Sequence, residues 1–346
     1  MNDACTLLND ASLRELNTLR VAASARWLAT LDDPATLPEF LARREFAGAP
    51  LLVLGQGSNL LFARDFDGLV LQPAWRRVSI TEDAGDAVLV RAEAGLGWDA
   101  LVDWTLALQI TGLENLALIP GLVGAAPIQN IGAYGAEVSE VIASVEAWDR
   151  CDSDAVLLTG ADCRFGYRDS LFKQEPDRWI VTAVNFRFAR DREPNLAYAG
   201  LRDELAALRI ERPSAAQVAQ AVRRLRRRKL PDPEFLPNAG SFFKNPVVPA
   251  ALADQLAQAN PGLPVHALPD GSCKLAAAWL IEACGLRGIR QGDAGVSAQH
   301  ALVLVNHGQA SGAELLGLAA RVADSVERRF GIRLAPEPRI VGASFP

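Results

Sequence analysis

The fold is expected to depend on one stretch, Pro120-Gly-Leu-Val-Gly-Ala-Ala-Pro-Ile-Gln-Asn-Ile-Gly-Ala-Tyr-Gly135. Its glycines let the backbone take positive φ and let a flat or phosphorylated ligand approach main-chain N–H groups closely. The amide side chains are Gln129 and Asn130, set among small and apolar residues. This composition suits a wall against a large neutral ring, and the alternative is a buried crossover rich in turns.

The bulk composition predicts an ordinary globular protein of two or three domains. The chain has 346 residues, of which 50% are hydrophobic and 22% charged, and its net charge is −6. The acidic balance argues against a general nucleic-acid binder. No run approaches 18 consecutive apolar residues, and the polar N-terminus resembles no signal peptide, so we expect a cytoplasmic protein without a membrane span.

The cysteines and histidines predict neither disulfides nor a metal site. The 5 cysteines are widely scattered and contain no C-x-x-C pair. The 3 histidines, His266, His300 and His307, share no spacing typical of metal ligands.

A second glycine-containing stretch follows the apolar run 51–54, which we interpret as a buried strand. It reads Gly55-Gln-Gly-Ser-Asn59. The first two glycines resemble a dinucleotide fingerprint, but Leu60 stands at the third position, which disfavours a Rossmann site. The motif still offers N–H groups and a hydroxyl to a pyrophosphate, and a plain tight turn is the alternative.

The pattern of the first two thirds predicts an α+β lobe rather than alternating βαβ units. Short β-type runs are separated by few helical segments. The expected strands cover residues 69–71, 78–80, 88–92, 144–148, 155–158 and 179–188, and the expected helical segments cover 37–46 and 99–109.

A basic helix is expected to begin after Ser214, which forms a capping-box pattern with Gln217. Val218, Ala221, Val222 and Leu225 fall on one face of it. Its end, Arg223-Arg-Leu-Arg-Arg-Arg-Lys229, is either a solvated helix face or a phosphate site.

Prolines 231, 233 and 237 mark a domain boundary, because proline stops the helix and stiffens the connector. A second lobe is expected to follow. Its predicted helices cover 274–284 and 311–330, and its predicted strands cover 301–305 and 339–342, the last returning to the first lobe.

Five motifs in order give the chain a family resemblance. To the two glycine-containing stretches are added Phe165-Gly-Tyr-Arg-Asp-Ser170, Pro237-Asn-Ala-Gly-Ser-Phe-Phe-Lys-Asn-Pro246 and Pro336-Glu-Pro-Arg339. The chain resembles the UDP-N-acetylenolpyruvoylglucosamine reductases, FAD enzymes of cytoplasmic peptidoglycan precursor synthesis, from Asn17 to Gly342. The resemblance implies an α+β fold with an FAD-binding lobe of the vanillyl-alcohol-oxidase (PCMH) type and a smaller α/β substrate-binding lobe.

These observations predict the domain organisation. An FAD-binding region is expected over residues 1–230, with subdomains of about 1–68 and 69–230, and with 336–346 returning to the first subdomain. A substrate-binding C-terminal domain is expected over 231–335.

The resemblance also implies the reaction and its cofactors. FAD, reduced by NADPH, would deliver hydride to the terminal carbon of the enolpyruvyl ether of UDP-N-acetylglucosamine enolpyruvate, giving UDP-N-acetylmuramate. All histidines lie beyond residue 260, so FAD is expected to be noncovalent. By resemblance the flavin would contact Gly55, Gln56, Gly57, Ser58, Asn59, Leu60, Pro120, Gly121, Gly124, Ala125, Gln129, Asn130, Ile131, Gly132, Ala133, Tyr134 and Arg339. A monomer without nucleic-acid partners is expected.

By resemblance the catalytic residues are Ser241, Arg168 and Glu337. Ser241 would protonate the carbon next to the hydride acceptor, and the other two would stabilise the enolate. Read without the resemblance, Ser241 is a turn or cap residue and the charged pair are surface ion-pair residues.

Substrate binding is carried over to a larger set. Its members are Tyr134, Arg168, Tyr198, Arg226, Lys229, Ser241, Asn245 and His300. Tyr198 matches the branch of the family that closes a tyrosine loop over the uridine diphosphate. The chain departs from that branch at His300, where glutamine is usual, and at Leu19-Arg20, where Phe-Gly is usual.

Two other functions fit parts of the sequence. One is another FAD-dependent oxidase or dehydrogenase of the same fold that acts on an alcohol or hydroxy acid. The other is an anion- or nucleic-acid-binding protein that uses the basic helix.

Overall fold

The computed structural model describes residues 5–345. By its internal contacts the chain divides into two compact units. The first unit holds the residues up to Ala11, Ala25–Gln56 and Asp67–Arg228, and the second holds Ser12–Ser24, Gly57–Phe66 and the residues from Lys229 onward. The units therefore interleave along the sequence more than the expected ranges do. Which region holds FAD and which holds substrate stays a prediction.

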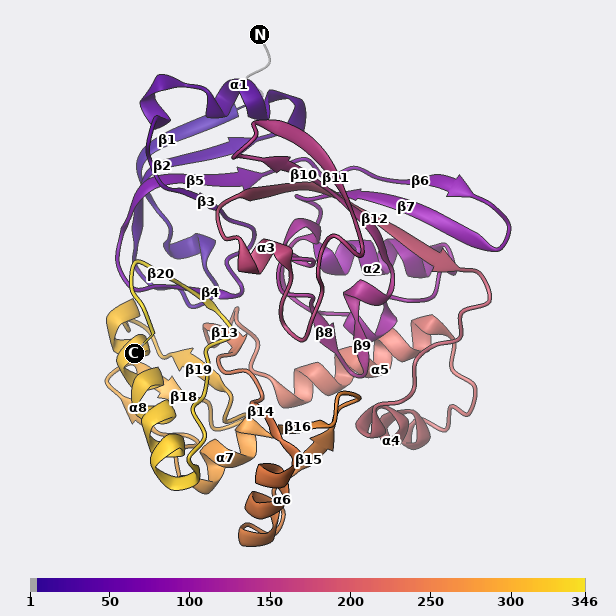
Figure 1. Ribbon diagram of the computed structural model, residues 1–346, viewed down its shortest axis with the longest axis vertical. Helices are drawn as coiled ribbons and strands as arrows, with labels where there is room; N and C mark the ends of the chain where they lie inside the picture. Colours follow the sequence, from indigo (N-terminus) through magenta and orange to yellow (C-terminus); the bar gives the residue numbers. More distant parts are fainter. Residues whose placement is uncertain (1–4, 346) are drawn as a thin grey trace. The chain divides into compact units, whose positions relative to one another are not determined.

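The first unit contains an antiparallel sheet of five strands in the order β11-β10-β12-β7-β6 (Figure 1). Its strands are β6 Val78–Asp83, β7 Ala87–Glu93, β10 Ile142–Asp149, β11 Asp154–Thr159 and β12 Trp179–Ala189. The central strand β12 buries Phe186 and Phe188, whose rings stack 6.0 Å apart. The β-type runs of the sequence within 78–188 are confirmed as strands of this sheet, in which β7, β10 and β12 have buried positions and β6 and β11 have none.

A second sheet of the first unit has the order β1-β2-β5-β3. Its strands are β1 Cys5–Ser12, β2 Ser24–Leu31, β3 Leu51–Val53 and β5 Phe66–Pro73. The helical prediction for 37–46 is only partly right. Helix α1 covers Leu37–Leu41, after which Arg43 takes an extended conformation, and a separate 3-10 turn η3, Arg44–Phe46, follows. The break lets Phe46 pack 5.0 Å from Phe40 and 5.5 Å from Trp27.

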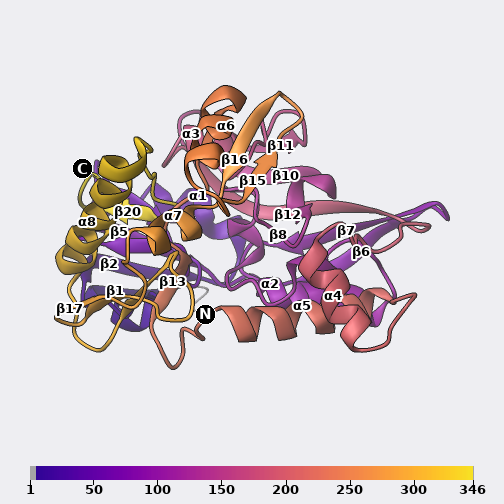
Figure 2. The same ribbon diagram turned by 90° about the horizontal axis from the view of Figure 1, so that it is seen from below.

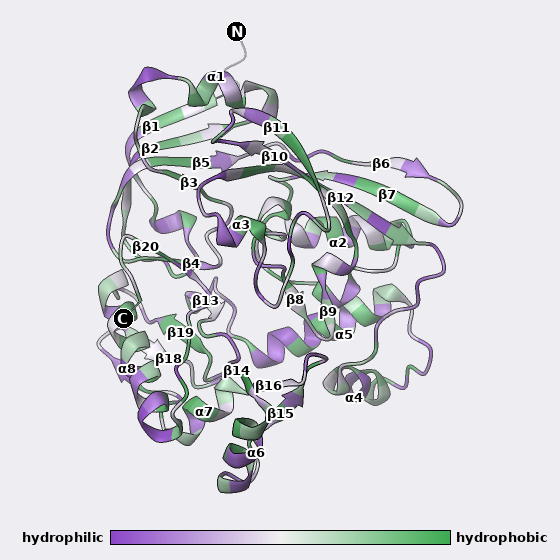
Figure 3. Cartoon of the chain, viewed as in Figure 1, coloured by the Kyte–Doolittle hydropathy of each residue, from purple (hydrophilic) through white to green (hydrophobic). Residues whose placement is uncertain are grey.

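The helices of the first unit are α2 Trp98–Ala107, α3 Leu171–Gln174, α4 Ala199–Ala207 and α5 Ala215–Lys229. The capping box of α5 is confirmed, because Gln217 N donates to Ser214 Oγ and Ser214 N donates to Gln217 Oε1. The predicted apolar face of α5 is buried. Helices α4 and α5 lie side by side (Figures 1 and 2), joined by an ion pair between Arg228 and Glu204. Figure 3 shows hydrophilic colour along the C-terminal part of α5.

The second unit contains three small sheets, in the orders β13-β19-β18-β17, β14-β16-β15 and β20-β4. Its strands are β4 Leu60–Phe62, β13 Asn238–Ser241, β14 Val247–Pro249, β15 Val265–Ala267, β16 Ser272–Leu275, β17 Arg290–Gln291, β18 Ala294–Val296, β19 Val303–Asn306 and β20 Arg339–Val341. Its α-helices are α6 Ala250–Ala259, α7 Ala277–Ala283 and α8 Gly312–Phe330.

Helix α8 begins as predicted with a capping box between Ser311 and Glu314. Its first residue, Gly312, packs against strand β4, and a Cβ there would lie 1.7 Å from the Phe62 carbonyl oxygen. Only glycine allows this approach. The helix ends at Gly331, whose φ of 68° is the left-handed cap conformation.

The helix predicted over 274–284 begins later in the structure than the sequence predicts. Lys274 belongs to strand β16, where it pairs with Val247 on one side and with His266 on the other. The helix α7 starts only at Ala277, because the ladder bonds of β16 use the preceding backbone. The strands predicted over 301–305 and 339–342 are present as β19 and β20, and β20 pairs in parallel with β4. No helix within residues 5–345 is long and apolar enough to cross a membrane.

Candidate active site

The Pro120–Gly135 stretch ends in a hairpin. Strands β8, Gly132–Ala133, and β9, Ala136–Glu137, pair through a turn in which Tyr134 and Gly135 have φ of 50° and 86°. Two consecutive positive φ angles are typical of the tight hairpin turn, and at Tyr134 they carry a conformational cost. The turn therefore holds the Tyr134 side chain in a fixed place.

Asn130 braces this hairpin from inside. It is 1% exposed, with φ of 46°. Its Nδ2 donates to Glu137 Oε2 at 2.8 Å and to the Gly166 carbonyl at 3.1 Å, and its Oδ1 accepts from Ser139 N at 3.1 Å. Both amide hydrogens of Asn130 are therefore engaged within the first unit.

Arg168 reaches the same hairpin. It lies in a tight turn closed by two backbone bonds between Gly166 and Asp169, and its φ is 54°. Its Nη2 donates to the Gly132 carbonyl at 2.5 Å, and Lys173 Nζ donates to the Arg168 carbonyl at 3.2 Å. Sequence segments near 130 and 168 thus meet, and they place a cation next to Tyr134.

Tyr198 and Arg226 complete this group in the first unit. Tyr198 precedes α4, and its ring meets that of Tyr134 edge to face at 5.2 Å. Burial raises the pKa of Tyr134, while the positive charge of Arg226 acts in the opposite direction. Burial lowers the pKa of Arg226, whose Nε donates to the Leu118 carbonyl at 3.1 Å. The structure therefore brings together Tyr134, Arg168, Tyr198 and Arg226.

The rest of the basic run has other partners. Arg223 donates to Asp99 at 2.8 Å and to Asp103 at 2.6 Å, and Arg228 donates to Glu204 at 2.8 Å. These two arginines connect α5 to α2 and α4 through ion pairs, so they have a structural role in the fold. Within the run, the charge of Arg226 acts more strongly on Tyr134 than the charge of Arg228 does.

In the second unit, Ser241 and Glu337 come from adjacent segments. Ser241 ends strand β13 and pairs with Val303 of β19. Glu337 N donates to the Phe242 carbonyl at 2.8 Å, one residue after Ser241. The buried rings of Phe242 and Phe243, 5.2 Å apart, anchor this segment. The two segments are therefore adjacent, and that Ser241 and Glu337 serve one site stays a prediction.

Three predicted substrate residues also lie in the second unit. Asn245 Oδ1 accepts from Ala277 N at 3.0 Å, so this oxygen caps helix α7. His300 Nδ1 accepts from Leu302 N at 3.3 Å, which leaves the proton of the neutral ring on Nε2. Burial lowers the pKa of His300, and the charge of Lys229 lowers it further. His300 and Lys229 are therefore neighbours.

The predicted flavin loop 55–60 is divided between the units. In the first unit Gln56 Oε1 accepts from Gly121 N at 2.8 Å, which joins the two glycine-containing stretches. In the second unit Gly57 has φ of 61°, and its carbonyl accepts from Thr18 N at 3.1 Å. Arg339 N donates to the Asn59 carbonyl at 3.1 Å. The order of the motifs along the sequence did not indicate these pairings.

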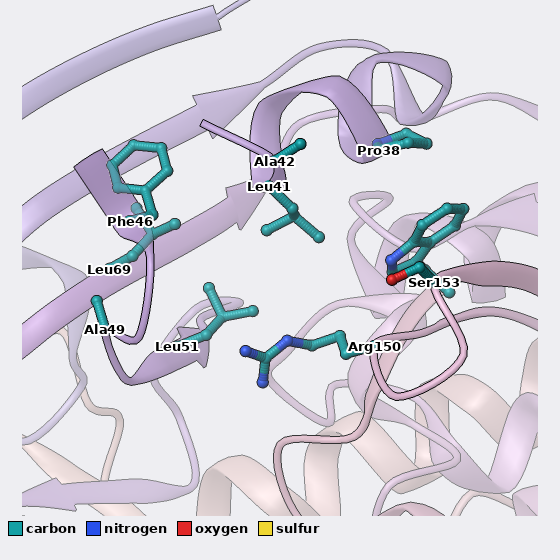
Figure 4. Close-up of a pocket in the computed structure, with 10 residues that line it drawn as sticks. Pro38, Leu41, Ala42, Phe46, Ala49, Leu51, Leu69, Arg150 and Ser153 are labelled. Carbon is teal, nitrogen blue, oxygen red and sulfur yellow. The ribbon is translucent and has the colours of Figure 1, made fainter. Parts of the chain in front are cut away.

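A cavity of about 330 Å³ lies elsewhere in the first unit (Figure 4). It contains none of the residues that the sequence predicts for the site. Its lining is Pro38, Leu41, Ala42, Phe46, Ala49, Leu51, Leu69, Trp148, Arg150 and Ser153.

Sequence patterns did not identify Asn115, whose side chain donates to the Tyr134 carbonyl of the predicted site. Its amide, next to Glu114 in the otherwise apolar run 113–119, was a usable signal of a buried polar role.

Comparison with known proteins gives concordant matches. Residues 232–341 match the model of the UDP-N-acetylenolpyruvoylglucosamine reductase C-terminal domain, and residues 26–158 match an FAD binding domain. The chain is 54% identical to the UDP-N-acetylenolpyruvoylglucosamine reductase of Xylella fastidiosa strain M12, over 97% of this chain and 96% of that protein. It is 54% identical to the enzyme of the same name from Xanthomonas euvesicatoria pv. vesicatoria strain 85-10, over 98% and 97% of the two chains. The crystal structure of the reductase from Thermus caldophilus matches with a TM-score of 0.65 and 25% identity, over 97% of this chain and 98% of that one.

Proposed function

The chain belongs to the UDP-N-acetylenolpyruvoylglucosamine reductase family, and from this membership we propose which residues serve each part of the reaction. It is an FAD-dependent oxidoreductase of peptidoglycan precursor synthesis, with NADPH as hydride donor. The fold is α+β, with an FAD-binding lobe and a second domain, as the sequence predicts.

The glycine-containing segments fit a flavin, because they gather main-chain N–H groups around positive-φ turns. Gly57, Gly121, Asn130 and Tyr134 all have positive φ. FAD would be held noncovalently by residues 55–60, 120–121, 124–125, 129–134 and Arg339. The fold itself requires glycine at position 124, because a Cβ there would lie 2.6 Å from the Cβ of Ala94.

When bound, FAD would supply the hydride transfer, from NADPH to the terminal carbon of the enolpyruvyl group. The protein must then stabilise an enolate and supply one proton. Ser241 donates its hydroxyl proton to the adjacent carbon. Arg168 places positive charge at the substrate carboxylate, and Glu337 either donates a proton in a hydrogen bond to the enolate, for which it must be protonated, or orients its neighbours. The hydrogen bond from Glu337 N to the carbonyl of Phe242, the residue after Ser241, is the observation that carries this assignment.

Substrate binding is assigned to two groups of side chains. Tyr134, Arg168, Tyr198 and Arg226 form the group of the first unit. Lys229, Ser241, Asn245 and His300 form the group of the second unit, in which Asn245 has only its Nδ2 to offer because its oxygen caps α7. His300 offers an Nε2–H donor in place of the glutamine amide.

The remaining assignments concern organisation. We place FAD binding in 1–230 and substrate binding in 231–335, with 336–346 returning to the first region. We also expect a cytoplasmic monomer. The alternative, an oxidase of the same fold, is disfavoured by the matched C-terminal domain.

Separate measurement of the two half-reactions tests the role of Ser241. In anaerobic stopped flow, S241A should be reduced by NADPH at nearly the wild-type rate and reoxidised by the enolpyruvyl substrate at least about 10²-fold more slowly. S325A, which alters a serine on helix α8 of the same unit, is the matched control and should change neither rate. Equal loss of both half-reactions in S241A would refute the assignment.

A further inference from the structure

Asn115 is a buried side chain that the reaction as assigned does not use. It lies in the 3-10 turn η4, Glu114–Leu116, and is 2% exposed. Its Nδ2 donates to the Tyr134 carbonyl at 2.8 Å and to the Asn195 carbonyl at 2.8 Å. An amide nitrogen has two hydrogens, so both are engaged with two segments that are far apart in the sequence.

Asn195 makes a second tie between the same segments. Its Nδ2 donates to the Gly135 carbonyl at 2.8 Å, and its Oδ1 accepts from Ala197 N at 2.9 Å. The residues that precede Tyr198 are thereby fastened to the turn that holds Tyr134. The two tyrosine rings meet at 5.2 Å as a result.

We propose that Asn115 is a positioning residue for substrate binding. It holds the segment before Tyr198 against the turn that carries Tyr134, whose backbone the hairpin fixes by itself, so the Tyr198 ring is in place before the substrate arrives. Such pre-organisation removes an ordering cost that binding would otherwise bear. The inference rests on the proposed function in one respect, that Tyr198 contacts the substrate.

The chemistry of the two acceptors requires an amide. Alanine at this position would leave two buried carbonyl oxygens without their donor, and aspartate would face both with a carboxylate. Loss of these hydrogen bonds would lower the free energy of unfolding whether or not Asn115 has a role in substrate binding. A role through Tyr198 makes a narrower claim, because the rise in KM caused by removing Asn115 must disappear when Tyr198 is also removed.

The test is a double-mutant cycle on N115A and Y198A. Steady-state KM for UDP-N-acetylglucosamine enolpyruvate is measured at saturating NADPH. N115A is expected to raise KM about tenfold, equivalent to about 1.4 kcal/mol, with kcat changed by less than about threefold. Y198A should also raise KM, and the double variant should bind no worse than Y198A. Additive increases would overturn the role of Asn115 alone, whereas an unchanged KM in Y198A would overturn the assignment of Tyr198 itself.

N195A extends the test in case N115A does not fold. Asn195 is half-buried, so its removal should be tolerated, and a smaller rise in KM, about threefold, should again vanish in the Y198A background. N185A is the matched control, since Asn185 is a half-buried amide of the same unit that donates to Glu146 at 3.1 Å. An equal rise in KM for N185A would mean general loosening of the unit and would refute the proposal.

Discussion

Replacing Arg226 with glutamine should weaken substrate binding without weakening the fold. Burial lowers the pKa of Arg226, which means that the fold bears a cost for holding this charge near Tyr134 and Tyr198. A hydrogen bond to a charged group contributes about 1.5–3 kcal/mol, so loss of a diphosphate contact corresponds to about 10- to 150-fold weaker binding. Glutamine removes the charge and relieves its desolvation, so the melting temperature should stay level or rise.

Arg228 on the same helix provides the matched control. Its side chain is 61% exposed and pairs with Glu204, an arrangement that contributes at most about 1 kcal/mol. Isothermal titration calorimetry of R226Q and R228Q with UDP and with UDP-N-acetylmuramate gives the two affinities directly. R228Q should differ from wild type by less than about threefold.

Two results would refute this reasoning. If R226Q and R228Q lose the same affinity, the basic run acts as a diffuse field and not through one residue. If R226Q keeps its affinity but melts at a lower temperature, the bond from Arg226 Nε to the Leu118 carbonyl stabilises the fold, and Arg226 has a structural role instead of a substrate-binding one.

Two further predictions concern stability. G312A should lower the free energy of unfolding, measured in urea, by at least about 1–3 kcal/mol, because the added Cβ would meet the Phe62 carbonyl. G317A in the same helix has nothing within 4 Å of its added Cβ and should raise the free energy of unfolding by about 0.5–1 kcal/mol. Similar changes in both variants would contradict the packing argument. Burial and the charges of Lys229 and Arg287 hold the pKa of His300 below 6.5, against the opposite effect of Glu282, so the unfolded state binds more protons below about pH 6.5. Wild-type stability relative to H300Q should therefore fall as pH drops from 7 to 5, and parallel urea-unfolding curves for the two proteins across that range would count against it.

Sequence patterns predicted most elements because burial repeats along them. The runs that became β10 and β12 alternate more buried and less buried positions over part of their length, and β7 is buried at most positions, whereas β11 has no buried position. The two capping boxes at Ser214 and Ser311 were readable because each depends on residues three apart. Local signals of this kind need no knowledge of distant partners.

The errors occurred where distant partners decide the structure. Lys274 carries no local sign that Val247 and His266 will pair with it on both sides. For the same reason the sequence did not indicate that Arg223 and Arg228 form ion pairs with carboxylates on α2 and α4. It also did not indicate that Asn115 donates hydrogen bonds to two carbonyls. The resemblance named Tyr134, Arg168, Tyr198 and Arg226 separately, and only the fold shows that they gather at one hairpin.

The parallel pairing of β20 with β4 has a consequence for biosynthesis. The partner of Arg339–Val341 is Leu60–Phe62, and Asn238 N donates to the Thr18 carbonyl, so the second unit combines residues that the ribosome makes early with residues that it makes much later. A fragment that starts at the proline-rich boundary would lack half of a sheet. Strand β4 can complete its sheet only after residues 339–341 have left the ribosome, and until then its edge stays uncovered, a period in which chaperones or aggregation compete.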